Sequence, residues 1–268
     1  MIWVVLILSV VLLFVLAWLF CICPSLRRHP DRKLLTGARI AHRGLHDDTV
    51  PENSLTAFHL AAEQGYAIEN DIHITADGEI VVFHDDTLER MCGVSGKPEE
   101  FTLAELKKLR LGGTEETIPT LAECLAVVDG RVPLLIEFKC RTNAVCSRLC
   151  PGADRILSEY KGVYWVQSFY PFVLSWYRKH RPEVCRGQLS TAFVGDKLHM
   201  RMLGMLLFNC IARPDFVSYD WQYRRKWNRR ICTLLGALPL GWTFRTQEDL
   251  DACRKDFAGY IFEGFRAK

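Results

Sequence analysis

The hydrophobic pattern divides the chain into two parts. Ile2–Cys23 is an apolar run without a charged residue, and from Ala38 onward short apolar runs alternate with longer amphipathic stretches. Short apolar runs separated by helix-length segments are typical of βα units with a parallel sheet. The pattern therefore predicts one apolar N-terminal helix followed by an α/β domain.

The short apolar runs of the second part predict the strands of that domain. Most of the segments between them are long enough for a helix, and two begin with capping boxes, at Thr102 with Glu105 and at Thr120 with Glu123. A closed (β/α)8 barrel, the TIM-barrel architecture, is the most economical arrangement of such units. The expected strands are Arg39–His42, Ala67–Ile72, Ile80–His84, Pro133–Phe138, Val163–Gln167, Arg186–Leu189, Phe216–Tyr219 and Pro239–Phe244, with Tyr260–Phe262 as a candidate ninth.

One connection does not fit a regular barrel. Only Thr75–Glu79 separates the second apolar run from Ile80, which is too short for a crossover helix, so this pair is expected to be antiparallel or distorted. The sequence therefore leaves the number of barrel strands undecided by one strand. A hairpin at Asp77-Gly78 would place His84 roughly opposite Asn70.

The N-terminal run is long enough to span a bilayer. A cleaved signal peptide would carry a basic first region and a small-residue cleavage site, and this run has neither, so an uncleaved anchor is favoured. Basic residues outnumber Asp31 just after it, which places the following domain in the cytoplasm. We expect an anchor at residues 1–23, a basic linker at 24–37 and the barrel at 38–268. The basic residues are Arg27, Arg28, Arg32 and Lys33.

Composition narrows the class of protein. With 268 residues, of which 49% are hydrophobic, the chain can bury one large core. A net charge of +3 is too small to indicate a nucleic-acid partner. Of eleven cysteines only Cys140, Cys146 and Cys150 cluster, without a histidine at metal-ligand spacing, so free cytosolic thiols are favoured over a zinc site.

Carboxylates at strand ends suggest a metal site. Glu69 and Asp71 are two residues apart on one predicted strand and so point to one face, and Glu137 and Lys139 repeat that spacing on another. Buried carboxylates that converge repel one another without a cation, and oxygen ligands favour Mg²⁺ or Ca²⁺. A buried ion pair of Glu137 with Lys139 is the alternative interpretation.

Two histidines also end apolar runs. His42 closes the first and His84 the third, and active sites of barrels lie at the carboxyl ends of the strands. Two imidazoles can divide the roles of general acid and general base. Arg43 and Lys139 would add fixed positive charge, and an arginine fork suits phosphate oxygens.

The motifs over Arg39–Lys139 resemble those of the glycerophosphodiester phosphodiesterase family. They are HRG at His42, PENS at Pro51–Ser54, IENDI, TADG, VVFHD, and IEFK at Ile136–Lys139, in that family's order and spacing. Beyond Cys140 the similarity is thinner. It comprises Gln167-Ser168-Phe169, Trp242-Thr243 and Gly259–Glu263, with Ala258 where the family has an aspartate.

The resemblance implies hydrolysis of a phosphodiester to glycerol 3-phosphate and an alcohol. The nucleophile is either water or the 2-hydroxyl of the substrate. A small insertion at about 87–118 would cap the barrel mouth. The implied roles are acid–base catalysis for His42 and His84, binding of a divalent cation, Mg²⁺ or Ca²⁺, for Glu69, Asp71 and Glu137, phosphate contacts for Arg43 and Lys139, and a further acidic position in the substrate site for Glu52.

Two later segments bear on the substrate. Leu198–Ile211 is strongly apolar and Tyr223–Arg230 is basic with aromatic residues between the charges. Each is either an ordinary barrel helix or part of a surface that meets anionic lipid, which would favour a lysophospholipid or other lipid-borne diester. Two other functions stay open: a phospholipase of the phosphatidylinositol-specific or sphingomyelin-cleaving kind, and an inactive barrel that binds lipid headgroups.

Overall fold

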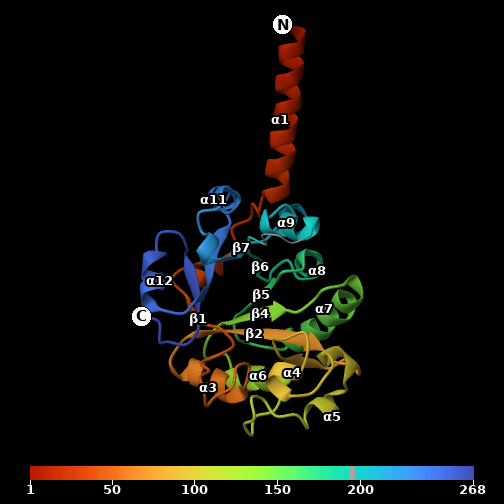
Figure 1. The fold of residues 1–268 in the computed structure, drawn as a ribbon, viewed down its shortest axis with the longest axis vertical. Coiled ribbons are helices and arrows are strands. Elements are labelled where there is room, and N and C mark those ends of the chain that lie inside the picture. Colours follow the sequence, from red (N-terminus) through yellow and green to blue (C-terminus); the bar gives the residue numbers. More distant parts are fainter. Residues whose placement is uncertain (193–196) are drawn as a thin grey trace.

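Parallel strands close into a barrel in the computed structural model, which describes residues 1–192 and 197–268 (Figure 1). The barrel closes because β1 pairs with β9 on one side and with β2 on the other. The predicted TIM-barrel fold is confirmed. Its strands are β1 (Arg39–Ala41), β2 (Ala67–Ile74), β4 (Leu134–Phe138), β5 (Tyr164–Ser168), β6 (Arg186–Ser190), β7 (Phe216–Asp220), β8 (Leu238–Phe244) and β9 (Gly259–Phe262).

The short connection after Ile74 forms a hairpin. β3 (Ile80–Val82) runs antiparallel to β2, with Ile74 opposite Ile80 and Ile72 opposite Val82. The backbone N–H of Phe83 donates to the carbonyl oxygen of Asp71 (2.9 Å), so this register continues toward His84. The third apolar run is therefore an addition to the barrel, and the candidate ninth strand completes it.

Helices cover the outside of the barrel. Side-chain caps set several of their starts: Ser54 accepts from the N–H of Ala57, and Thr120 forms the expected capping box with Glu123. The helices are α2 (Arg32–Leu35), α3 (Leu55–Glu63), α6 (Leu121–Val128), α7 (Asn143–Leu157), α8 (Pro171–His180), α9 (Leu198–Gly204), α10 (Asn209–Ala212), η2 (Trp221–Tyr223), α11 (Trp227–Leu234) and α12 (Gln247–Ala252).

The expected insertion forms a small cap between β3 and α6. It contains α4 (Glu89–Cys92), η1 (Pro98–Glu100) and α5 (Leu103–Leu106), and Thr102 with Glu105 makes the second expected capping box. The cap has its own apolar cluster, in which Leu88, Leu106 and Leu111 pack against Phe83. It is thus attached firmly to the strand addition that carries His84.

The interior of the barrel has an apolar layer and a polar layer. Side chains from neighbouring strands, among them Ile40, Leu135, Trp165 and Ile261, pack with Leu35 of α2 in one buried cluster. Successive inward positions of a strand are two residues apart, and two residues further along these strands the inward positions are polar or charged. The charged layer therefore lies at the carboxyl ends of the strands.

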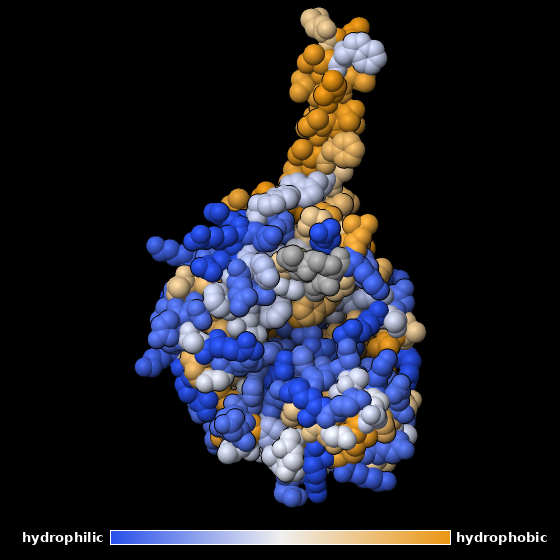
Figure 2. Space-filling view, in the orientation of Figure 1, coloured by the Kyte–Doolittle hydropathy of each residue, from blue (hydrophilic) through white to orange (hydrophobic). Residues whose placement is uncertain are grey.

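The N-terminal helix stands apart from the barrel. α1 (Ile2–Ile22) is exposed along its length, with only Ile22 buried, and Figure 2 shows its apolar surface projecting from a mostly hydrophilic body. It is long and apolar enough to cross a membrane, a test that a signal sequence would also meet.

The two later segments that were singled out in the sequence lie at the base of this helix. Leu198–Ile211 is not one helix: α9 and the short α10 divide it, and Leu203 and Asn209 are buried. Tyr223–Arg230 contains the start of α11, where Trp227 contacts Trp18 with ring centroids 4.9 Å apart.

Candidate active site

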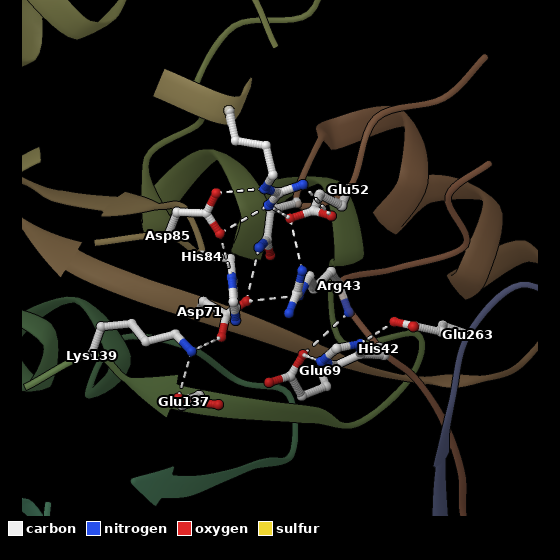
Figure 3. Close-up of polar contacts among 12 residues, drawn as sticks. His42, Arg43, Glu52, Glu69, Asp71, His84, Asp85, Glu137, Lys139 and Glu263 are labelled. Atoms are coloured by element: carbon white, nitrogen blue, oxygen red, sulfur yellow. Dashed lines mark hydrogen bonds and ion pairs between the residues drawn. The ribbon is translucent and has the colours of Figure 1, made fainter. Parts of the chain in front are cut away.

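The charged layer brings together all eight residues selected from the sequence (Figure 3). Inward positions of β2 and β4 supply Glu69, Asp71 and Glu137. Lys139 follows β4, and the segments after β1 and β3 supply the others. Alternation along each strand explains this grouping, since Glu69 and Asp71 follow Ala67, and Glu137 and Lys139 follow Leu135, on the inward face.

Three carboxylates converge at the centre. Glu69, Asp71 and Glu137 are buried, and each offers an oxygen within 4.8 Å of the others. Burial, followed by the charges of Asp71 and Glu137, raises the pKa of Glu69 well above its ordinary value. The buried Glu69 Oε1 has no hydrogen-bond partner. An unpaired oxygen among converging carboxylates fits a hard divalent cation.

Lys139 also compensates part of this charge. Its Nζ lies 2.9 Å from Asp71 Oδ1 and 2.6 Å from Glu137 Oε1. Burial would lower the pKa of Lys139, but the two carboxylates outweigh that effect and raise it. The ion pair of Glu137 with Lys139, foreseen as an alternative to a metal site, is present. It leaves Glu69 Oε1 without a hydrogen-bond partner, so the ion pair does not exclude a cation at the three carboxylates.

The loop after β1 turns Arg43 back over the carboxylates. Its N–H donates to Glu69 Oε2 (3.1 Å), and its guanidinium lies 2.9 Å from Glu52 Oε1 and 3.6 Å from Asp71 Oδ2. Gly44 has a φ of +81°, and a Cβ there would lie 2.8 Å from Ala57, so the turn requires glycine.

His42 forms a pair with a residue that the sequence analysis did not select. Its Nδ1 lies 2.5 Å from Glu263 Oε2, just after β9, and its Nε2 lies 4.0 Å from Glu69. Burial lowers the pKa of His42 to about 4 despite this contact, which favours a neutral imidazole. Glu263 could have been selected from the sequence, because it comes two residues after the inward Ile261 and so shares its face of the strand.

His84 has a similar arrangement. Its Nδ1 lies 2.7 Å from Asp85 Oδ1, and Arg90 of α4 binds Asp85 (2.5 Å from Nε to Oδ2) and Glu52 (2.6 Å). Burial opposes ionisation of Asp85, but hydrogen bonds from Arg90 and His84 lower its pKa to about 2. Asp85 and Arg90 were not assigned from the sequence, since only the cap's fold brings Arg90 here.

Comparisons with known proteins show the family of the chain. A model of the glycerophosphoryl diester phosphodiesterase family matches residues 42–195. The chain is 31% identical over 231 residues to a glycerophosphodiester phosphodiesterase of Caldanaerobacter subterraneus subsp. tengcongensis, covering 79% of this chain and 87% of the relative. It is 34% identical over 251 residues to the Homo sapiens protein glycerophosphodiester phosphodiesterase 1, with 78% and 72% covered.

Solved structures match the fold as well. An Oleispira antarctica phosphodiesterase in complex with the product sn-glycerol-3-phosphate superimposes with a TM-score of 0.70 at 24% identity, covering 86% of this chain and 94% of that one. A Thermotoga maritima glycerophosphodiester phosphodiesterase gives a TM-score of 0.65 at 25% identity, with 84% and 94% covered. Fold, site and relatives together define a phosphoric diester hydrolase. The chain belongs to the glycerophosphodiester phosphodiesterase family.

Proposed function

We propose that this barrel hydrolyses glycerophosphodiesters by acid–base catalysis between His42 and His84, with a divalent cation, Mg²⁺ or Ca²⁺, on Glu69, Asp71 and Glu137. The observation that carries the proposal is the matched setting of the two histidines. Each has its Nδ1 against a carboxylate, so each Nε2 is left to exchange a proton. Carboxylates that hold an imidazole in this way also set its tautomer.

The chain's own residues account for the proton transfers and for the binding of phosphate. Arg43 and Lys139 bind the nonbridging oxygens, one histidine takes the proton of the nucleophile, and the other protonates the leaving alkoxide. A divalent cation, when bound, neutralises charge that develops at phosphorus. Water and the substrate's own 2-hydroxyl both fit as nucleophile. Attack by water gives an alcohol with glycerol 3-phosphate, or with a lysophosphatidate when the substrate is a lysophospholipid. Attack by the 2-hydroxyl expels the same alcohol and gives a cyclic phosphate first, which water then opens.

Glu52 has a supporting part in this proposal. It lies between Arg43 and Arg90, at 2.9 Å and 2.6 Å, so it orients two cationic side chains at the mouth of the barrel. A carboxylate that holds an arginine reduces the conformational entropy lost when that arginine binds phosphate. Glu52 therefore acts through its neighbours.

We also propose that the substrate is a lipid that resides in the membrane. In this reading residues 1–23 are the anchor, 24–37 the basic linker, and 38–268 the barrel with its cap at about 87–118. A tether of that kind gives little advantage with a soluble diester, whereas a lysophospholipid gains local concentration. The charges after Cys23 favour a cytoplasmic barrel.

Substrate and metal dependence test the proposal together. The full chain in detergent is offered glycerophosphocholine, lysophosphatidylcholine, phosphatidylinositol and sphingomyelin, with and without EDTA. We expect cleavage of the first two, loss of activity in EDTA, and recovery with Mg²⁺ or Ca²⁺. Glu69→Gln should need a higher metal concentration, by about 10- to 100-fold, while the exposed Glu63→Gln on α3 serves as matched control.

Other outcomes would contradict the proposal in distinct ways. Full activity after exhaustive chelation would remove the cation from the mechanism. Cleavage of phosphatidylinositol or sphingomyelin alone would support the phospholipase alternative. Binding of lipid headgroups without any turnover would support the inactive barrel.

A further inference from the structure

A second cavity lies where α1 meets the barrel. Its volume is about 620 Å³, and it is open to solvent on one side. The last turn of α1, the segment after it, α8, the start of β6 and the residue after α10 line it. None of these lining residues belongs to the candidate active site, so a ligand here would be separate from the reaction.

Four arginines face this cavity, and we call it the arginine cavity after them. They are Arg27, Arg178, Arg186 and Arg213. No acidic residue is among the described residues that line it. The nearest recorded counter-charge is Asp215, whose Oδ2 lies 3.7 Å from Arg186 Nη1. The charge of Glu183 also interacts with that of Arg27. Four guanidinium groups with two carboxylates leave the cavity positively charged.

Arg186 is the most buried of the four. Its side chain is only 8% exposed, and its hydrogen bonds to backbone carbonyl oxygens are long, at 3.3 to 3.5 Å. Burial lowers the pKa of Arg186. Asp215 and Cys185 raise it, and the charges of Arg178 and Arg27 lower it, so that the overall shift is downward. The ion pair with Asp215 is long, so it compensates the buried charge only in part, and an anion in the cavity would add to that compensation.

The other wall of the arginine cavity is apolar. Leu19 and Phe20 of α1 contribute to it, together with Leu26 and Leu235. Phe20 and Leu26 are 62% and 82% exposed, although the guanidinium of Arg213 lies 4.5 Å from the centroid of the Phe20 ring. A ligand that satisfies both walls needs a negative headgroup and an apolar tail.

The arginine cavity has a fixed place relative to α1. Asn209 Nδ2 donates to the carbonyl oxygen of Ile22 (3.0 Å), and Arg213 Nη1 donates to that of Cys23 (2.7 Å). His29 in the following segment lies 2.6 Å from the carbonyl oxygen of Glu183, so this linker is held against the barrel. The end of α1 therefore cannot swing away from the four arginines.

The length of α1 sets the depth of the cavity in a bilayer. A helix of 21 residues is about 32 Å long, close to the hydrocarbon thickness of about 30 Å. Its last turn then reaches the level of the headgroups, and the cavity lies at that level because this turn lines it. Figure 1 shows α1 projecting away from the barrel beyond this point. This step rests on the proposed anchoring by α1.

We infer that the arginine cavity binds the phosphate headgroup of an anionic phospholipid, with the acyl chains lying along the exposed apolar side of α1. Basic pockets beside a membrane helix suit such headgroups. Free phosphate would leave the apolar wall exposed, and a neutral lipid would leave the arginines unpaired. The bound lipid is thus a structural ligand that fixes how the barrel rests on the membrane.

Phosphatidic acid is the probe for this inference, because it carries a phosphate monoester that a phosphodiesterase does not cleave. The full chain in a neutral detergent is titrated with it, and bound lipid is counted by native mass spectrometry. We expect one lipid per chain. Arg27→Ser/Arg178→Ser should weaken binding by about tenfold, because two exposed cations at the headgroup level are removed. Lys97→Ser/Lys108→Ser in the cap removes the same charge away from α1 and should leave binding unchanged.

Each contrary result would overturn the inference. Equal loss of binding in the cap variant would mean general attraction of an anion. Equal binding of diacylglycerol would mean an apolar groove without headgroup recognition, and competition by inorganic phosphate at the same affinity would mean a free anion site. Hydrolysis of glycerophosphocholine is measured in parallel with both double variants. Loss of lipid binding with normal hydrolysis, or the reverse, separates this inference from the proposed reaction.

Discussion

The Nδ1 atom of His42 lies 2.5 Å from Glu263 Oε2, although the two residues come from the first and last strands of the barrel. Pairing of β1 with β9 brings them together, with Ala41 opposite Phe262. The carboxylate accepts the Nδ1 proton of a neutral imidazole, so Nε2 is left as the basic nitrogen beside Glu69. Closure of the barrel therefore completes the setting of a candidate catalytic histidine.

This pairing predicts unequal effects of two substitutions. His42→Ala should lower kcat by about 10²–10⁴-fold, because one proton transfer is lost. Glu263→Gln keeps the imidazole but not its tautomer, so kcat should fall by about 10- to 100-fold with little change in KM. Steady-state kinetics with glycerophosphocholine measures both. The exposed Glu248→Gln on α12 is the control, and a Glu263→Gln enzyme with unchanged kcat would remove the positioning role.

The same pair predicts a pH dependence of stability. Burial opposes ionisation of Glu263, but the hydrogen bond from His42 and the charge of Arg245 lower its pKa from 4.5 to about 2. A carboxylate whose pKa is lower in the folded state stabilises the fold above the unfolded pKa, and this contribution is lost as the pH falls toward 2. Between pH 5 and pH 3 the wild type should therefore lose more free energy of unfolding than Glu263→Gln. Denaturant titrations at both pH values measure this, and parallel losses would show that Glu263 is not ionised preferentially in the fold.

The orientation of α1 predicts where the barrel lies. Basic residues after Cys23 favour the cytoplasmic side, so a reporter fused after Lys268 should be active only if it functions in the cytoplasm. An active reporter of the extracytoplasmic kind would reverse the orientation. A fusion to a chain that lacks residues 1–23 controls for reporter folding.

The local alternation of side chains along each strand was sufficient to predict much of the candidate active site. Glu69 and Asp71, and Glu137 and Lys139, share a face because strand side chains alternate, and this holds before any tertiary contact is known. The short Thr75–Glu79 connection likewise permitted only a hairpin or a distortion, and β3 is antiparallel. The residues selected from the sequence lie together because they sit at the ends of neighbouring strands.

The same reasoning did not predict contacts between residues that are brought together by the folding of separate elements. Arg90 reaches Asp85 only because the cap folds back over β3, and Glu263 reaches His42 only because the barrel closes. Strand alternation places Glu263 on the inward face, but no local pattern shows that it meets His42, and Arg90 has no such signal. The apolar period also failed to show that Leu198–Ile211 breaks into α9 and α10, because the burial of Leu203 and Asn209 depends on other elements.

The sequence by itself determined the barrel class, the apolar N-terminal helix and the shared faces of Glu69 with Asp71 and of Glu137 with Lys139, since periodicity and length decide these locally. Only the tertiary structure decided which carboxylate holds each histidine and where the four arginines meet the end of α1. Arg27 and Arg213 are far apart along the chain, and they face one cavity because α10 packs against α1. Charges that come together in this way depend on the packing of whole elements, which no local pattern records.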